Sequence, residues 1–236
     1  MTGILAIDTA TEACSIALWR DGQLDERYEL AARQHSQRIF SMLRELLADG
    51  NLRKQGIGAI AWGCGPGSFT GLRIAASAVQ GLAFTNDLPV VAVSTLACQA
   101  QTAYREGLVA EGGCVLSTLD ARINEIYAAP YHIAQGLAVP LAEAVACAPG
   151  QLELADDIES AVAVGSGCQF MQLFPGQVQA RITASSNDLM PHARDLVPLA
   201  AEQLEQGEVQ TAREVQPVYV RDEINWKKIP EQGKRS

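Results

Sequence analysis

A glycine-rich segment at residues 63–71 places the strongest constraint on how this chain can fold. It follows an apolar run at 57–62 that predicts a buried strand, and it leads into a helical pattern at about 72–84. A strand, a tight turn and a helix in that order are typical of α/β proteins. Such a turn can hold an anion on its backbone N–H groups, although the segment has neither a Walker lysine nor the G-x-G-x-x-G spacing. Phosphate binding and close packing of the helix against the strand are therefore both open interpretations.

The remaining apolar patterns predict two similar halves. The first half has the predicted order β-β-β-α-β-α-β-α, with Asp8 at the end of its first strand. The second half starts in the same way, with a strand that ends at Asp120. The predicted strands are 4–7, 14–19, 23–30, 57–62, 89–93, 114–119, 125–132 and 161–164, and the predicted helices are 36–48, 72–84, 94–105, 169–174 and 191–206. We therefore expect an α/β fold of duplicated β-β-β-α-β-α halves at 1–107 and 108–236, with the last segment packing back on the first half.

Two predicted helices in the first half differ in character. The helix at 36–48 is amphipathic, and we expect Ser36 to cap its start and Gly50 to stop it. The helix at 71–86 is apolar on every side, with Arg73 as its only charged residue. A helix that is apolar all round must be covered on more than one face. It lies either deep within the domain or with one side against another protein chain.

Composition excludes several classes of protein. The chain has 27 acidic and 18 basic residues and a net charge of −9, so we do not expect it to hold nucleic acid over a broad surface. The uncharged stretch at 55–72 contains six glycines and a proline and does not suit a membrane helix. The first ten residues lack a basic leader region and the six cysteines form no C-x-x-C pair, so we expect a cytoplasmic protein with reduced thiols. The three histidines lie far apart, and Ser68 lacks the G-x-S-x-G context, which disfavours a catalytic metal and a hydrolase nucleophile.

Several short segments resemble the signature segments of the TsaB (YeaZ) family. They come in the family's order and extend over nearly the whole chain. These segments are 7–11, 34–36, 65–74, 120–122, 125–127 and 217–221. The resemblance implies an ASKHA fold, the architecture of actin, Hsp70 and sugar kinases. It also implies a role in making threonylcarbamoyladenosine at position 37 of tRNAs that read ANN codons.

The resemblance further implies that the chain is not the transferase itself. In that family a paralogue, TsaD, holds a metal through an H-x-x-x-H motif and binds threonylcarbamoyl-adenylate, and an ATPase, TsaE, joins the pair. We therefore expect a TsaD-type catalytic partner, a TsaE-type ATPase, only indirect contact with tRNA, and no contact with a membrane. ATP or ADP and the metal are expected in the partner subunits, with no cofactor bound by this chain. Alone, the chain is expected to form a homodimer.

The family's interface is built from its first two helices, which correspond here to about 36–48 and 71–84. The candidate interface residues are apolar side chains on these two helices, namely Ile39, Leu43, Leu46, Ile74, Ala78 and Leu82. Apolar burial would supply the affinity for the partner. The sequence leaves open which of these residues face the sheet and which face the partner.

Other residues point to a relict nucleotide site. Its candidates are Asp8, Thr9, Gly65, Gly67 and Asp120. Ala10 stands where a turn that approaches phosphate would have glycine, and the resemblance places Thr95 and Gln99 where the paralogue's metal histidines would be. Two alternative functions follow from this region: an ATP-dependent phosphotransferase that uses an aspartate with the glycine segment, and a glycoprotease-like peptidase, which would need a metal. The structural alternative is that each aspartate caps local N–H groups at its strand end.

Overall fold

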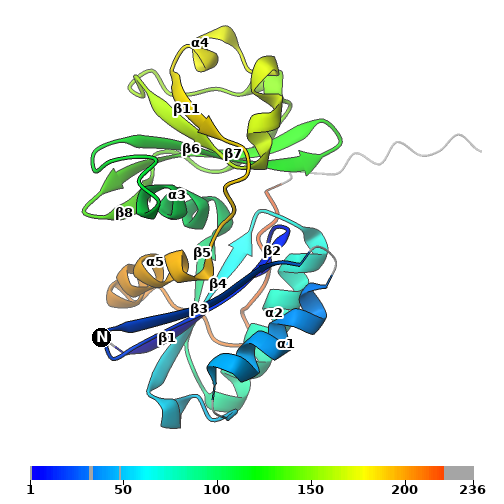
Figure 1. Ribbon diagram of the computed structural model, residues 1–236, viewed down its shortest axis with the longest axis vertical. Coiled ribbons are helices and arrows are strands. Elements are labelled where there is room, and N and C mark those ends of the chain that lie inside the picture. Colours follow the sequence, from blue (N-terminus) through cyan, green and yellow to red (C-terminus); the bar gives the residue numbers. More distant parts are fainter. Residues whose placement is uncertain (1, 32–33, 48, 221–236) are drawn as a thin grey trace, which may run out of the picture.

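The computed structural model describes residues 2–31, 34–47 and 49–220, which form two β-sheets with helices between and outside them (Figure 1). The first sheet contains β1 (Gly3–Asp8), β2 (Ala13–Arg20), β3 (Gln23–Leu30), β4 (Ile57–Gly65) and β5 (Val90–Ser94). The second contains β6 (Cys114–Arg122), β7 (Glu125–Ala134), β8 (Leu137–Pro140), β9 (Val145–Cys147), β10 (Ala161–Val164) and β11 (Ile182–Ser186). The α-helices are α1 (His35–Leu46), α2 (Phe69–Asn86), α3 (Thr95–Arg105), α4 (Gly176–Gln179) and α5 (Ala193–Gln206). Short 3-10 helices are η1 (Arg53–Gln55), η2 (Pro149–Gln151) and η3 (Ser166–Leu173).

Both sheets have the same strand order. The first runs β3-β2-β1-β4-β5, and the second runs β8-β7-β6-β10-β11. In each sheet the first three strands form an antiparallel meander, and the last two lie parallel to the first strand. Strand β9 is an addition that pairs with β7. The common order confirms the predicted α/β class and the duplication.

The burial of each strand follows from its place in the sheet. All six residues of β1 are buried, because the strand lies at the centre of the first sheet with helices on both faces. The edge strand β3 has no buried residue and alternates between half-buried and exposed side chains. Between β2 and β3, Asp21 and Gly22 both have positive φ angles, of 53° and 79°, as a two-residue hairpin turn requires.

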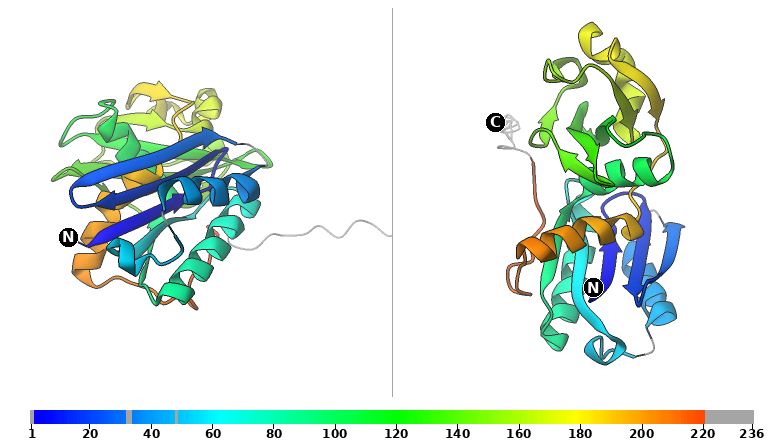
Figure 2. Two further views of the ribbon diagram at one scale, coloured as in Figure 1. Left: turned by 60° about the horizontal axis from the view of Figure 1, so that its bottom comes forward. Right: turned by 90° about the vertical axis from the view of Figure 1, so that its left-hand side faces the viewer.

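Helices α3 and α5 lie between the two sheets, and each packs mainly on the sheet of the other half (Figures 1 and 2). Helix α3 contacts β6, β7 and β8, while α5 contacts β1, β2, β4 and β5. Together with the facing strands they form the core between the sheets. Helices α1 and α2 cover the outer face of the first sheet and enclose a second core cluster. On the outer face of the second sheet, η3, α4 and the chain around η2 enclose a third cluster.

The start of α5 is fixed by polar contacts to the rest of the chain. The buried Asp195 carboxylate accepts hydrogen bonds from Thr102 Oγ1 at 2.7 Å and from Arg105 Nε at 2.8 Å, both on α3. Just before the helix, the His192 ring stacks on Tyr28 with centroids 4.0 Å apart. These contacts tie the start of the last helix to α3 and to β3 of the first sheet.

The predicted limits of the first helix are wrong. Helix α1 begins at His35, one residue before the predicted cap Ser36, and the residue that precedes the helix makes no side-chain cap. The helix ends at Leu46, because Leu47 adopts an extended conformation. The predicted stop at Gly50 therefore lies well beyond the true end.

Other boundaries also differ from the prediction. Helix α2 starts three residues earlier, because Ser68 Oγ accepts a hydrogen bond from Gly71 N at 3.2 Å and caps the first turn. The helix predicted at 169–174 is the longer 3-10 helix η3. Strands β9 and β11 were not predicted, since β9 has only three residues and β11 is mostly polar. In the part of the chain that the structure describes, no helix has the length and apolarity needed to cross a membrane.

Candidate functional site

Asp8, at the end of β1, is buried completely at the junction between the two sheets. Its Oδ1 atom accepts a hydrogen bond from Ala10 N at 3.1 Å, whereas Oδ2 has no hydrogen-bond partner among the described residues. Burial raises the pKa of this carboxyl from 3.8 to about 7, against the lowering effect of the bond from Ala10. A magnesium ligand in a phosphotransferase must be ionised and reachable, and the buried Asp8 carboxyl does not meet the second condition.

Thr95 and Gln99, on α3, are also completely buried. The amide of Gln99 is fully engaged, since Nε2 donates to Leu189 O at 2.8 Å and Oε1 accepts from Ser117 Oγ at 2.6 Å. Thr95 Oγ1 has no hydrogen-bond partner in the described ranges. Nor do those ranges contain a group of three or more His, Cys, Asp or Glu residues that could hold a metal ion. The residues at this position therefore do not fit the metal centre that the resemblance assigns to the paralogue.

The glycine-rich segment packs directly against the turn that follows β1. Side chains at Gly67 or Gly71 would collide with the backbone oxygens of Ala10 and Thr9. Thr9 Oγ1 donates to Gly71 O at 2.7 Å, and Ser68 N donates to Ala10 O at 2.6 Å. These contacts explain the glycines by close packing. Nucleotide binding at this turn remains a prediction, and it would require the turn and the glycine segment to separate.

Asp120 occupies the corresponding strand end in the second half, but its surroundings differ. Its side chain is partly exposed, and its Oδ1 atom accepts a hydrogen bond from Arg122 N at 2.8 Å. The Arg122 guanidinium lies 3.7 Å from Oδ2, and Asp120 N donates to Ser166 Oγ at 3.0 Å. Local capping of backbone N–H groups accounts for this aspartate.

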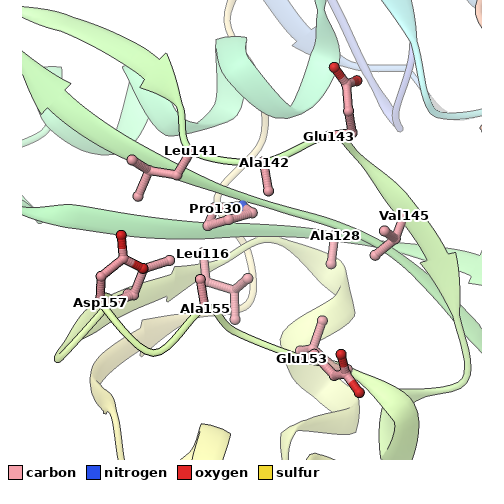
Figure 3. Close-up of a pocket in the computed structure, with 12 residues that line it drawn as sticks. Leu116, Ala128, Pro130, Leu141, Ala142, Glu143, Val145, Glu153, Ala155 and Asp157 are labelled. Carbon is pink, nitrogen blue, oxygen red and sulfur yellow. The ribbon is translucent and has the colours of Figure 1, made fainter.

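A hollow on the outer face of the second sheet has an apolar floor with Leu116, Ala128 and Pro130, and acidic residues at its margin (Figure 3). Figure 3 shows the side chains of Glu143 and Glu153 on opposite sides of the hollow. Because the carboxylates do not converge on one point, the hollow offers no ligand set for a metal ion.

The six predicted interface residues lie on α1 and α2 and contribute to the core cluster beneath these helices. Ile39, Leu43 and Ala78 are buried within the chain, and Leu46, Ile74 and Leu82 are partly buried against the same cluster. Most of their apolar surface is thus already covered by the first sheet. Helical periodicity identified the apolar side of each helix, and that side is mainly the one that packs inward.

The solvent side of α1 and α2 carries other large apolar residues. We call this surface the docking face and define it by Phe40, Phe69 and Phe84, which are 51%, 56% and 69% exposed. A groove between the helices runs across it, and its lining residues are Ser36, Phe40, Phe69, Thr70, Arg73, Ile74, Ser77 and Ala78. Only Ile74 and Ala78 of the six predicted residues reach this groove. The sequence analysis did not select the three phenylalanines as interface residues. The available signal was that each is a large apolar residue at the edge of the apolar side of its helix.

Small residues continue the exposed stripe of α2 from the groove toward the end of the helix. Ser77 and Gly81 both face solvent. A side chain at Gly81 would meet no atom of the described residues within 4 Å. A glycine inside a helix is roughly 1 kcal/mol less favourable than alanine, so packing within this chain does not explain Gly81. A small residue at this position instead permits the close approach of another helix.

Comparison with known proteins gives a consistent result. A family model described as TsaD, tRNA N6-adenosine threonylcarbamoyltransferase, matches residues 28–227. The chain is 38% identical over 237 residues to the tRNA threonylcarbamoyladenosine biosynthesis protein TsaB of Escherichia coli K12, covering 96% of this chain and 98% of that protein. The protein of the same name from Haemophilus influenzae is 36% identical, with 96% and 97% covered.

A solved structure extends the similarity to three dimensions. YeaZ from Pseudomonas aeruginosa superposes with a TM-score of 0.85 at 39% identity, covering 93% of this chain and 100% of that chain. The two sheets of equal strand order, with this structural match and the TsaD model, identify the fold as ASKHA. The resemblance seen in the short motifs is therefore confirmed, and the chain belongs to the TsaB (YeaZ) family of tRNA threonylcarbamoyladenosine biosynthesis proteins.

Proposed function

We propose that this chain is the non-catalytic partner subunit of the enzyme that transfers threonylcarbamoyl to adenosine 37 of tRNAs reading ANN codons. The docking face binds a TsaD-type paralogue, which supplies the metal and the adenylate, and a TsaE-type ATPase acts with the pair. The chain binds no cofactor, meets tRNA only through its partner and works in the cytoplasm. Without its partner it forms a homodimer through the same face.

The exposed stripe of α2 is the observation that carries this proposal. Gly81 and Ser77 form a smooth strip that ends at the exposed ring of Phe84, and nothing in the described chain covers it. Exposed aromatic rings beside small residues favour helix-against-helix docking, because the backbones can approach closely while the rings bury apolar area.

The buried junction between the sheets supports a non-catalytic role. Both polar atoms of the Gln99 amide form hydrogen bonds within the chain, and the Asp8 carboxyl is completely buried. A phosphotransferase or a metallopeptidase would need reachable ligands at this point. We therefore assign the catalytic chemistry to the partner.

Light scattering after size-exclusion chromatography tests the proposal. The protein is run alone and mixed with the H-x-x-x-H-bearing paralogue from the same organism. We expect a stable one-to-one complex that replaces the homodimer, and threonylcarbamoyladenosine formation on tRNA only when both chains are present with the ATPase. Failure of the two chains to associate at micromolar concentration would contradict the proposal.

A further inference from the structure

The described chain ends in a segment that returns to the first half and runs beside α2 (Figures 1 and 2). We call residues 215–219 the C-terminal strap. Val215 is buried in the core cluster under α1 and α2, and its carbonyl accepts a hydrogen bond from Gln80 Nε2 at 2.9 Å. Further along, Val218 N donates to Cys64 O at 2.8 Å. The strap is thus fixed at two points beside the glycine-rich segment.

One glycine of that segment is needed for the strap. Gly65 has a φ angle of +120°, and a side chain there would lie 2.5 Å from Val218 O. Only glycine combines this backbone conformation with such close approach of another backbone. Gly65, which the sequence suggested for nucleotide binding, therefore makes room for the strap in this structure.

At the end of the strap, Tyr219 joins two residues of α2. The Tyr219 and Phe69 rings have centroids 5.8 Å apart, and the Arg73 guanidinium carbon lies 3.8 Å from the centroid of Phe69. Arg73 Nε donates a hydrogen bond to Tyr219 Oη at 3.3 Å. We call these three residues the shelf. Phe69 and Arg73 also line the groove of the docking face, so the shelf forms one end of that groove.

The shelf holds Arg73 in an arrangement that suits an incoming carboxylate. Within the described residues no acidic side chain forms an ion pair with Arg73, and its Nε contact leaves the two terminal nitrogens directed elsewhere. Those nitrogens form the planar fork that binds a carboxylate through two parallel hydrogen bonds. An aromatic ring under the guanidinium restricts its motion and shields it from water on one side.

A protein carboxylate fits this place better than an RNA phosphate. The groove beside the shelf is lined in part by apolar Ile74 and Ala78, which favours a protein helix. The chain as a whole carries a net charge of −9, which opposes an RNA backbone. Arg73 is the only charged residue of α2, so it is the one cation of this helix that can select a partner by charge.

We propose that the C-terminal strap, through Tyr219, positions Arg73 to receive a carboxylate of the TsaD-type partner. This inference rests on the proposed function, since it assumes that the docking face meets such a partner. The docking face is then formed by α1 and α2 together with the strap, which lies far from them in the sequence. Exposed Arg and aromatic residues that are held in place before binding are the kind that dominate protein interfaces.

Isothermal titration calorimetry with the purified paralogue tests this at low and high salt. Arg73→Ala should weaken binding about 30-fold or more and reduce its salt dependence, and Arg73→Lys should weaken it about 10-fold, because lysine keeps the charge and loses the fork. Tyr219→Ala should weaken binding about 10-fold, and Tyr219→Phe, which keeps the ring contact with Phe69 and loses the hydrogen bond to Arg73, should weaken it by a smaller factor. The matched control is Leu173→Ala in η3, a residue 61% exposed on the second half, which should leave binding unchanged.

The outcomes separate this inference from the proposed function. If the unaltered chain does not bind the paralogue, the proposed function fails. If it binds, and Arg73→Ala binds equally well with the same salt dependence, the positioning role of the shelf is overturned and the proposed function stands. Unchanged binding of Tyr219→Ala would also contradict it, because Tyr219 would then have no part in positioning Arg73. Weakened binding to tRNA, with unchanged binding to the paralogue, would assign Arg73 to a phosphate instead.

Discussion

The two halves of the molecule share one sheet topology and differ in what covers its outer face. In the first half, α1 and α2 lie on the sheet and present three exposed phenylalanines. In the second half, the outer layer consists of η2, η3 and the four-residue helix α4. Strand order is retained because each sheet needs the same core, whereas the outer layer is free to change. The groove and the exposed phenylalanines of the docking face thus belong to the outer layer of the first half.

The two strand-end aspartates differ in the same way. Asp8 is sealed between the sheets, while Asp120 is partly exposed and bound to its own loop. Equivalent positions in the duplicated fold thus differ in burial and in hydrogen bonding. Burial raises the pKa of Asp8, whereas the Asp120 carboxylate accepts a hydrogen bond from its own loop.

The largest expected effect concerns the contact between α3 and α5, the two helices that lie between the sheets. Asp195→Ala removes the carboxylate that joins α5 to α3 and leaves Arg105 with Glu106, at 3.4 Å, in place of its shorter contacts to Asp195. We expect a loss of about 3–5 kcal/mol in the free energy of unfolding, measured by urea denaturation. Asp156→Ala, which breaks a surface pair with Arg181 on the second half, is the control and should have no measurable effect. If Asp195→Ala lowers the free energy of unfolding no more than the control does, the Asp195 carboxylate does not hold α3 and α5 together.

The next effect is the pH dependence of stability that the buried Asp8 causes. The folded-state pKa of Asp8 is about 7 and its ordinary value is 3.8, so between these values the folded protein holds a proton that the unfolded chain has lost. Asp8 therefore lowers the free energy of unfolding as the pH rises from about 4 to 7, by up to about 1.4 kcal/mol per pH unit. Above pH 7 it causes no further change in the free energy of unfolding. Urea midpoints at several pH values should show this slope in the unaltered protein but not in Asp8→Asn. Parallel curves for Asp8→Asn and the unaltered protein would contradict it.

Asp8 also allows a test of the phosphotransferase alternative. Tight binding of Mg-ATP by the isolated chain, abolished in Asp8→Ala, would favour that function over a docking role. We expect no such binding, because the carboxyl is enclosed by the packed turn and glycine segment. Equilibrium dialysis with Mg-ATP is the measurement.

The smallest expected effect distinguishes the two sides of α1. Phe40→Ala should change the free energy of unfolding by less than about 0.5 kcal/mol, because the ring is half exposed. Its neighbour Ile39 is fully buried, and Ile39→Ala should cost about 2–5 kcal/mol. Thermal unfolding of both variants gives the comparison. Similar losses for the two would mean that Phe40 belongs to the core.

The sequence predicts the central strands of both sheets because they are short apolar runs with clear ends, and it misses the three-residue β9 and the mostly polar β11. It does not predict what meets the glycine-rich segment, since Thr9, Ala10 and Val218 reach it only through the tertiary fold. For the same reason it could not assign faces: an apolar periodicity marks Ile39 and Leu43, which the chain itself buries. The contact between Phe69 and Tyr219 joins residues that are far apart in the sequence, so no local pattern encodes it.

Docking through α1 and α2 is tested most directly by a bulky residue at Gly81. Gly81→Glu has open space in the chain and improves helix propensity, so the variant should fold at least as stably as the unaltered protein. The Ala78→Glu substitution is less informative, because Ala78 is buried and its change would also disturb the core. Gly176→Glu, at an equally open glycine on α4, is the matched control. Light scattering of each variant mixed with the TsaD-type paralogue should show a complex for Gly176→Glu and separate chains for Gly81→Glu. A normal complex with Gly81→Glu would contradict docking through this face.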